Sequence, residues 1–126
     1  MLLKNKNAII TGCNRGIGRS ILEGFAANGA NIIACIRKEN DEFSKVINDL
    51  SERHSVQITP IYFDAININE IKVAVKQIQS MKIPIDVLVN NAGITYNALF
   101  QMSTMDKLKE VFDINFISPF IFTQYI

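Results

Sequence analysis

The stretch TGCNRGIGRS, residues 11–20, sets three glycines between two apolar segments of different character. The residues before it, 7–11 (NAIIT), form a short apolar run and predict a strand. Residues 16–28 predict a helix, and Gly29 follows where a helix commonly ends. The apolar side chains of that helix recur at helical spacing: Ile17, Ile21, Leu22 and Phe25. A glycine-rich loop between a strand and a helix can bring backbone N–H groups close to a pyrophosphate.

The three glycines of this loop have separate expected tasks. Gly12 allows a tight exit from the strand, while Gly16 and Gly18 let the backbone approach the phosphates. The spacing G-x-x-x-G-x-G lacks the lysine that a nucleoside-triphosphate loop requires after its last glycine. The alternative is a plain strand-to-helix turn, but the glycine spacing and the following helix favour a dinucleotide cradle.

The rest of the chain alternates strand-like and helix-like segments. Further strands are predicted over residues 31–36, 56–63 and 85–89. Helical stripes lie within residues 43–50 and 71–78, and a fourth helix runs from residue 103 to the end, capped by Ser103 or Thr104. Four strands alternating with four helices predict an α/β fold with right-handed crossovers and a parallel sheet covered on both faces.

Composition limits the classes of function. The 126 residues are enough for one domain, residues 1–126, and 48% of them are hydrophobic. The 13 basic and 12 acidic residues give a net charge of +1, which argues against an electrostatic nucleic-acid binder. Cys13 and Cys35 form no disulfide framework, no metal-ligand spacing occurs, and no leader or membrane-spanning stretch is found. We therefore expect a cytoplasmic protein without membrane or nucleic-acid partners.

The end of the second strand bears on the choice of dinucleotide. A carboxylate about 20 residues after the glycine loop would hold a ribose 2′-hydroxyl, but residues 34–38 (ACIRK) contain none. Arg37 and Arg15 could instead pair with a 2′-phosphate, because a planar guanidinium matches a phosphate well. This predicts NADP(H) over NAD(H). The alternative is that Arg37 and Lys38 form a solvated strand end.

A second motif, NNAGIT at residues 90–95, follows the fourth predicted strand. Together with T-G-x-x-x-G-x-G at residues 11–18, it resembles the short-chain dehydrogenase/reductase family, and most of all the 3-oxoacyl-(acyl-carrier-protein) reductases. The resemblance covers essentially the whole chain, as the N-terminal half of a family member. It implies a Rossmann-type, doubly wound parallel sheet, here about four strands in the order 3-2-1-4 with four helices.

The resemblance also implies site residues. Those expected along the pyrophosphate and the adenosine ribose are Gly12, Asn14, Arg15, Gly16, Ile17 and Gly18. Asp64 would lie against the adenine; the other interpretation is a helix-capping or turn residue, and the two roles are compatible. Asn91, Ala92 and Gly93 would follow the nicotinamide-side ribose. Asn115 matches the asparagine of the family's Asn-Ser-Tyr-Lys catalytic tetrad. Pro119, four residues later, is expected to remove a hydrogen bond from the Asn115 carbonyl and to kink the helix.

The remaining tetrad residues are not matched in this chain. Tyr62 and Tyr96 have no lysine four residues later, Tyr125 is followed by one residue, and Ser118 falls within the last helix. The resemblance implies that a complete form would transfer hydride between NADPH and a carbonyl substrate of 3-oxoacyl type. A non-catalytic NADP(H)-binding module and an inactive remnant are the alternatives. The apolar last helix predicts a homo-oligomer.

Overall fold

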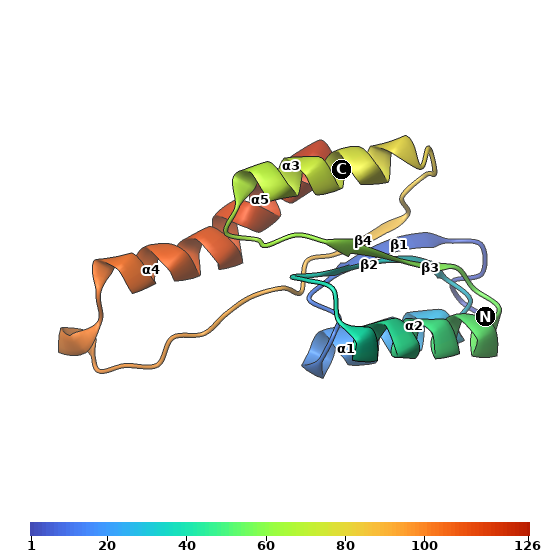
Figure 1. The fold of residues 1–126 in the computed structure, drawn as a ribbon, viewed down its shortest axis with the longest axis horizontal. Coiled ribbons are helices and arrows are strands. Elements are labelled where there is room, and N and C mark those ends of the chain that lie inside the picture. Colours follow the sequence, from blue (N-terminus) through green and yellow to red (C-terminus); the bar gives the residue numbers. More distant parts are fainter.

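A computed structural model describes residues 1–126. Strands and helices alternate through the chain (Figure 1). In chain order the elements are β1 (Asn7–Thr11), α1 (Gly16–Ala27), β2 (Asn31–Ile36), α2 (Asp41–His54), β3 (Ile58–Tyr62), α3 (Ile68–Ser80), β4 (Val87–Val89), a 3₁₀ turn η1 (Phe100–Met102), α4 (Met105–Phe112), a π turn η2 (Asp113–Ile117) and α5 (Ser118–Tyr125).

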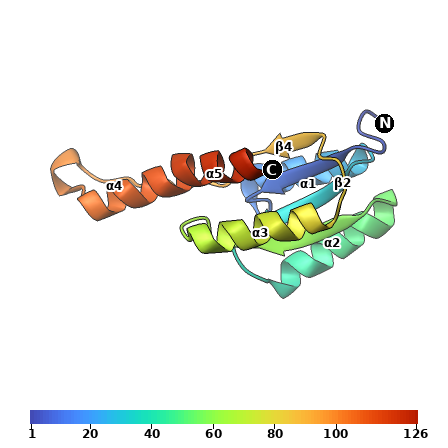
Figure 2. The same ribbon diagram turned by 90° about the horizontal axis from the view of Figure 1, so that it is seen from above.

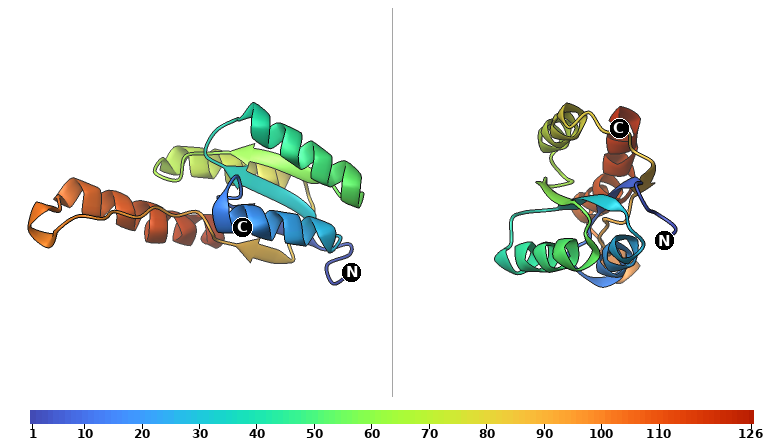
Figure 3. Two further views of the ribbon diagram at one scale, coloured as in Figure 1. Left: turned by 90° about the horizontal axis from the view of Figure 1, so that it is seen from below. Right: turned by 90° about the vertical axis from the view of Figure 1, so that its right-hand side faces the viewer.

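The four strands form one parallel sheet in the order β3-β2-β1-β4. Ile9 of β1 pairs with Ile33 of β2 on one side and with Leu88 of β4 on the other. Helices α1 and α2 cover one face, and α3 and α5 cover the other, as the end-on view in Figure 3 shows. The predicted fold class and strand order are confirmed.

The two faces of the sheet have separate apolar cores because successive strand residues point to opposite sides. Ile10 packs with Leu22 of α1 and with the buried stripe of α2. Ile9 packs on the other face, where Phe63 and Phe122 stack with ring centroids 5.4 Å apart. Phe122 is 2% exposed, so α5 is an integral part of the second layer.

Two strands begin later than the sequence predicts. The predicted start of β3 at residue 56 is wrong because the N–H of Gln57 donates to the side-chain oxygen of Asn31, 2.9 Å away, and the ladder starts at Ile58. The predicted start of β4 at residue 85 is wrong because the N–H of Asn7 donates to the Asp86 carboxylate at 2.8 Å. At these positions a side chain accepts one backbone N–H, while the carbonyl groups of Gln57 and Asn7 still accept backbone N–H groups of Ile32 and Asp86.

The last predicted helix is interrupted by a π turn. The N–H of Ser118 donates to the carbonyl of Asp113, five residues back, and Pro119 lies in the first turn of α5. The missing N–H of Pro119 is thus accommodated by a local widening of the helix, a feature found often at functional sites. Figure 2 shows α4 and α5 following one another along a single arm; α5 packs on the sheet, and α4 extends beyond it.

Much of this arm is apolar and exposed. Its exposed large side chains are Met105, Leu108, Phe112, Phe116, Ile117 and Phe120. Of the two predicted caps, Ser103 and Thr104, it is Thr104 that caps α4: its hydroxyl accepts the N–H of Lys107 at 3.2 Å. None of the helices is both long and apolar enough to cross a membrane.

Candidate functional site

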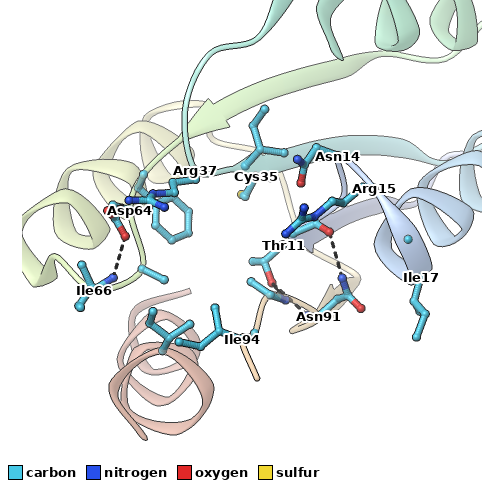
Figure 4. A pocket seen from close by; sticks show the side chains of 18 of the residues that line it. Thr11, Asn14, Arg15, Ile17, Cys35, Arg37, Asp64, Ile66, Asn91 and Ile94 are labelled. Atoms are coloured by element: carbon cyan, nitrogen blue, oxygen red, sulfur yellow. Dashed lines mark hydrogen bonds and ion pairs between the residues drawn. The ribbon is translucent and has the colours of Figure 1, made fainter. Parts of the chain in front are cut away.

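A cavity of about 640 Å³ opens at the carboxyl ends of the strands, where β1 lies between β2 and β4. Ligands of open α/β sheets bind at this position, where the strand order reverses. The cavity is drawn in Figure 4. Ten residues that the sequence singled out line it: Gly12, Asn14, Arg15, Gly16, Ile17, Arg37, Asp64, Asn91, Ala92 and Gly93.

The glycine loop approaches the cavity through two left-handed backbone positions. Gly12 has φ +64°, and a Cβ there would lie 2.8 Å from the Cα of Ala92. Gly16 has φ +59°, and no atom would lie within 4 Å of a Cβ there. Gly12 therefore permits close packing of the loop against residues 91–93, whereas Gly16 leaves open space at the cavity wall.

Gly18 lies deeper than the other two glycines of the loop. It is buried, it is not among the residues that line the cavity, and a Cβ there would lie 2.1 Å from the carbonyl oxygen of Gly12. The same Cβ would lie 2.4 Å from the side-chain nitrogen of Asn91. Gly18 therefore packs beneath the loop and lets α1 lie close to β1; its place along a pyrophosphate stays a prediction.

The N-terminus of α1 faces the cavity without a side-chain cap. Its N-cap residue is Arg15, and no acidic residue lies in its first turn. By contrast, side chains of Asn40, Asn67 and Thr104 cap α2, α3 and α4. The free N–H groups and the positive end of the α1 dipole therefore favour an anion at this wall.

Thr11 connects the two motifs, a role the sequence reasoning missed. Its hydroxyl oxygen accepts the N–H groups of Asn91 and Ala92, each at 3.0 Å, and the hydroxyl lies 3.4 Å from the carbonyl oxygen of Val89. The side chain of Asn91 in turn donates to the carbonyl of Gly12 at 3.0 Å. The available signal was a threonine at the end of the first predicted strand, just before the loop.

Charged groups gather at the end of the cavity formed by β2 and β3. Arg37 pairs with Asp64 at 3.3 Å (Nε to Oδ2). The other carboxylate oxygen of Asp64 accepts the N–H of Ile66 at 3.2 Å, so the turn alternative for Asp64 is correct. The capping alternative is wrong, since Asn67 caps α3. Arg15 also lines the cavity and takes part in none of the chain's four ion pairs.

Asn115 contacts the NNAGIT segment rather than the cavity itself. Its Oδ1 accepts the N–H of Ile94 at 2.8 Å, and its Nδ2 donates to the Ile94 carbonyl at 2.7 Å. Three residues later, Ser118 donates to the carbonyl of Ala65, beside Asp64. One stretch of the last helix thus holds both the segment after β4 and the loop after β3.

The two cysteines lie beneath this site as buried, free thiols. Burial raises the pKa of Cys13 from 9.0 to about 12. Burial also raises the pKa of Cys35, which lines the cavity floor, with a further contribution from Cys13. Both thiols are therefore protonated and unreactive near neutral pH.

Several further cavity residues were not singled out in the sequence. Ala65 and Ile66 follow β3, Ile94 belongs to the second motif, and Glu110 and Ile114 come from the last helix. Glu110 and Ile114 reach the cavity because the chain between β4 and α4 returns the last helix to the sheet.

Comparison with known proteins places this geometry in a family. The family model described as short chain dehydrogenase matches residues 6–126. The 2-dehydro-3-deoxy-D-gluconate 5-dehydrogenase of Formosa agariphila is 32% identical over 98% of this chain and 47% of its own length. The 3-oxoacyl-[acyl-carrier-protein] reductase of Aquifex aeolicus is 32% identical over 97% of this chain and 49% of its own length.

Solved structures of short-chain dehydrogenases and of L-sorbose reductase share the fold of this chain. The crystal structure of L-sorbose reductase from Gluconobacter frateurii, complexed with NADPH and L-sorbose, matches 98% of this chain and 46% of that chain. Its TM-score is 0.89 at 27% identity. A short-chain dehydrogenase/reductase from Serratia marcescens matches 99% of this chain and 51% of its own at a TM-score of 0.89 and 26% identity. The chain spans about half the length of the curated relatives it matches, and it belongs to the short-chain dehydrogenase family.

Proposed function

We propose that this chain is the NADP(H)-binding part of an oxidoreductase that transfers hydride between NADPH and a carbonyl substrate of 3-oxoacyl type. The observation that carries the proposal is the cavity at the strand order reversal. One of its walls is the uncapped N-terminus of α1, and two arginines lie on its rim. The family membership and the NADPH-bound L-sorbose reductase among its structural relatives support a dinucleotide there.

The residues present fit such a cofactor. The open space at Gly16 and the free N–H groups of α1 suit a pyrophosphate, which carries negative charge. Asp64 suits the adenine end, since its carboxylate can accept a hydrogen bond. Arg37 and Arg15 are proposed to hold the 2′-phosphate, and residues 34–38 at the end of β2 contain no carboxylate.

The other end of the cavity is proposed to hold the nicotinamide-side ribose along Asn91, Ala92 and Gly93. The bound nicotinamide would supply hydride chemistry. This chain would orient the nicotinamide by fixing residues 91–94 from two sides: Thr11 holds Asn91 and Ala92, and Asn115 holds Ile94. We propose Asn115 as this chain's member of the catalytic tetrad.

The substrate and the partners are the remaining parts of the proposed function. A 3-oxoacyl thioester is the proposed substrate because the sequence motifs most resemble those of 3-oxoacyl reductases, although the relatives' names include several sugar-acid and sugar substrates. We also propose a homo-oligomer formed through the exposed apolar arm, and a reducing cytoplasm, which suits two buried free thiols.

The test is the oxidation of NADPH by the natural full-length protein in the presence of a 3-oxoacyl thioester, followed at 340 nm. We expect thioester-dependent oxidation that a ketose does not match. Oxidation with the ketose alone would overturn the substrate class. Saturable NADPH binding without turnover on any carbonyl would favour a non-catalytic binding module.

A further inference from the structure

The ion pair between Arg37 and Asp64 joins two groups that the proposed function assigns to different parts of the same cofactor. Arg37 is assigned to the 2′-phosphate and Asp64 to the adenine. In the structure, Nε of Arg37 lies 3.3 Å from Oδ2 of Asp64, and both residues line the cavity. Figure 4 shows them together at one side of the cavity, apart from Asn14 and Arg15 on the glycine loop.

The backbone keeps these two side chains within reach of one another. Ile36, the last residue of β2, pairs with Tyr62 of β3, and the N–H of Phe63 donates to the Ile36 carbonyl at 3.1 Å. Arg37 and Asp64 are the next residues to leave this ladder, so both emerge at the same edge of the sheet. The pair is therefore built into the register of two neighbouring parallel strands.

The two partners differ in freedom. The side chain of Asp64 is 27% exposed, and its other carboxylate oxygen accepts the N–H of Ile66 at 3.2 Å. The side chain of Arg37 is 78% exposed, and Asp64 is its only ion-pair partner. The carboxylate is thus fixed, and the guanidinium is the partner that can turn away at little cost.

We infer that Asp64 is a specificity-determining residue: it holds Arg37 in the free protein, and its carboxylate competes with the 2′-phosphate of NADP(H) for the Arg37 guanidinium. This inference rests on the proposed binding of NADP(H). A ligand with the 2′-phosphate must draw Arg37 away from Asp64, whereas NAD(H) leaves the pair intact. Asp64 therefore reduces the preference for NADP(H) that Arg37 creates.

The inference predicts a particular change in cofactor preference. Asp64→Asn removes the charge but keeps an oxygen that can accept from Ile66 and from an adenine amino group. We expect the ratio of Kd for NADH to Kd for NADPH to rise about two- to fivefold, the range set by an exposed ion pair. The ratio is the readout because a change that weakens or strengthens the binding of both dinucleotides equally leaves it unchanged.

A matched control is available next to the pair. Glu70 is exposed, and its Oε1 accepts the N–H of Asp64 at 3.1 Å, but it pairs with no arginine. Glu70→Gln removes one negative charge at nearly the same place and keeps that acceptor. We expect it to leave the Kd ratio unchanged. An equal rise in Glu70→Gln and Asp64→Asn would reduce the effect to general electrostatics and overturn the inference.

A double-mutant cycle separates this inference from the proposed function. Fluorescence titrations of the natural full-length protein with NADPH and NADH give the ratio for Arg37→Gln, Asp64→Asn and the double variant. We expect Arg37→Gln to lower the ratio and Asp64→Asn to have no further effect in that background. If Arg37→Gln lowers the ratio but Asp64→Asn does not raise it in the native background, competition is refuted and NADP(H) binding stands. If Arg37→Gln leaves the ratio unchanged, the assignment of Arg37 to the phosphate fails, and the inference fails with it.

Discussion

Replacing Gly18 with alanine should destabilise the chain, although the same change elsewhere in α1 should stabilise it. A Cβ at residue 18 would lie 2.1 Å from the Gly12 carbonyl oxygen and 2.4 Å from the Asn91 side-chain nitrogen. Overpacking of this kind costs about 1–3 kcal/mol, and the lost hydrogen bond from Asn91 to Gly12 adds about 1 kcal/mol. We expect Gly18→Ala to lower the free energy of unfolding by about 2–4 kcal/mol.

Gly24 provides the control for this experiment. It lies in the same helix, it is exposed, and no atom would lie within 4 Å of a Cβ there. Gly24→Ala should therefore raise the free energy of unfolding by about 0.5–1 kcal/mol, because alanine loses less backbone entropy in a helix interior.

Urea denaturation followed by far-UV circular dichroism measures both variants. The reasoning requires opposite signs for the two substitutions. A Gly18→Ala protein as stable as the Gly24→Ala protein would show that the loop and Asn91 relax freely. In that case the close approach of α1 to β1 would not be what holds the glycine loop in place.

Two further predictions concern the site. Asn115→Ala removes both hydrogen bonds to Ile94, so we expect about 1–2 kcal/mol of lost stability and weaker NADPH binding. The control is Asn97→Ala, an exposed residue in the same segment as Ile94, which should change neither quantity. Equal effects of the two substitutions would contradict the role of Asn115. Burial keeps Cys13 and Cys35 protonated in the folded state while the unfolded thiols ionise near pH 9, so the free energy of unfolding should fall as the pH rises from about 9 to about 12. Urea titrations of the double alanine variant of these cysteines should give a shallower fall, and an unchanged slope would count against their burial.

The fold could be predicted from local patterns of apolar residues along the chain. Runs of β-branched residues such as 31–36 marked buried strands, and the stripes of α2 and α3 repeat at helical spacing, so element order and the parallel sheet could be predicted. Gly29, with φ +89°, directly follows the C-cap of α1, as its position in the sequence predicts. The starts of β3 and β4 could not be predicted, because they depend on side chains of Asn31 and Asp86 that reach neighbouring strands.

The candidate site was predictable in membership but not in arrangement. The two motifs identified the residues of the loop and of the segment after β4 because both carry strong local spacing. The packing of Gly18 under the loop, the central place of Thr11 and the pairing of Arg37 with Asp64 each depend on contacts between distant segments. The hydrogen bond from Ser118, just after the π turn, to the carbonyl of Ala65 is a further contact between distant segments.

The most direct test of the account is a calorimetric titration of the natural full-length protein with NADPH and, separately, with NADH. The cavity residues, with the uncapped α1 N-terminus and with Arg15 and Arg37 on the rim, predict saturable binding of both dinucleotides and a lower Kd for NADPH. Binding of neither dinucleotide would contradict the cofactor site itself. Tighter binding of NADH than of NADPH would contradict the assignment of the two arginines to a 2′-phosphate.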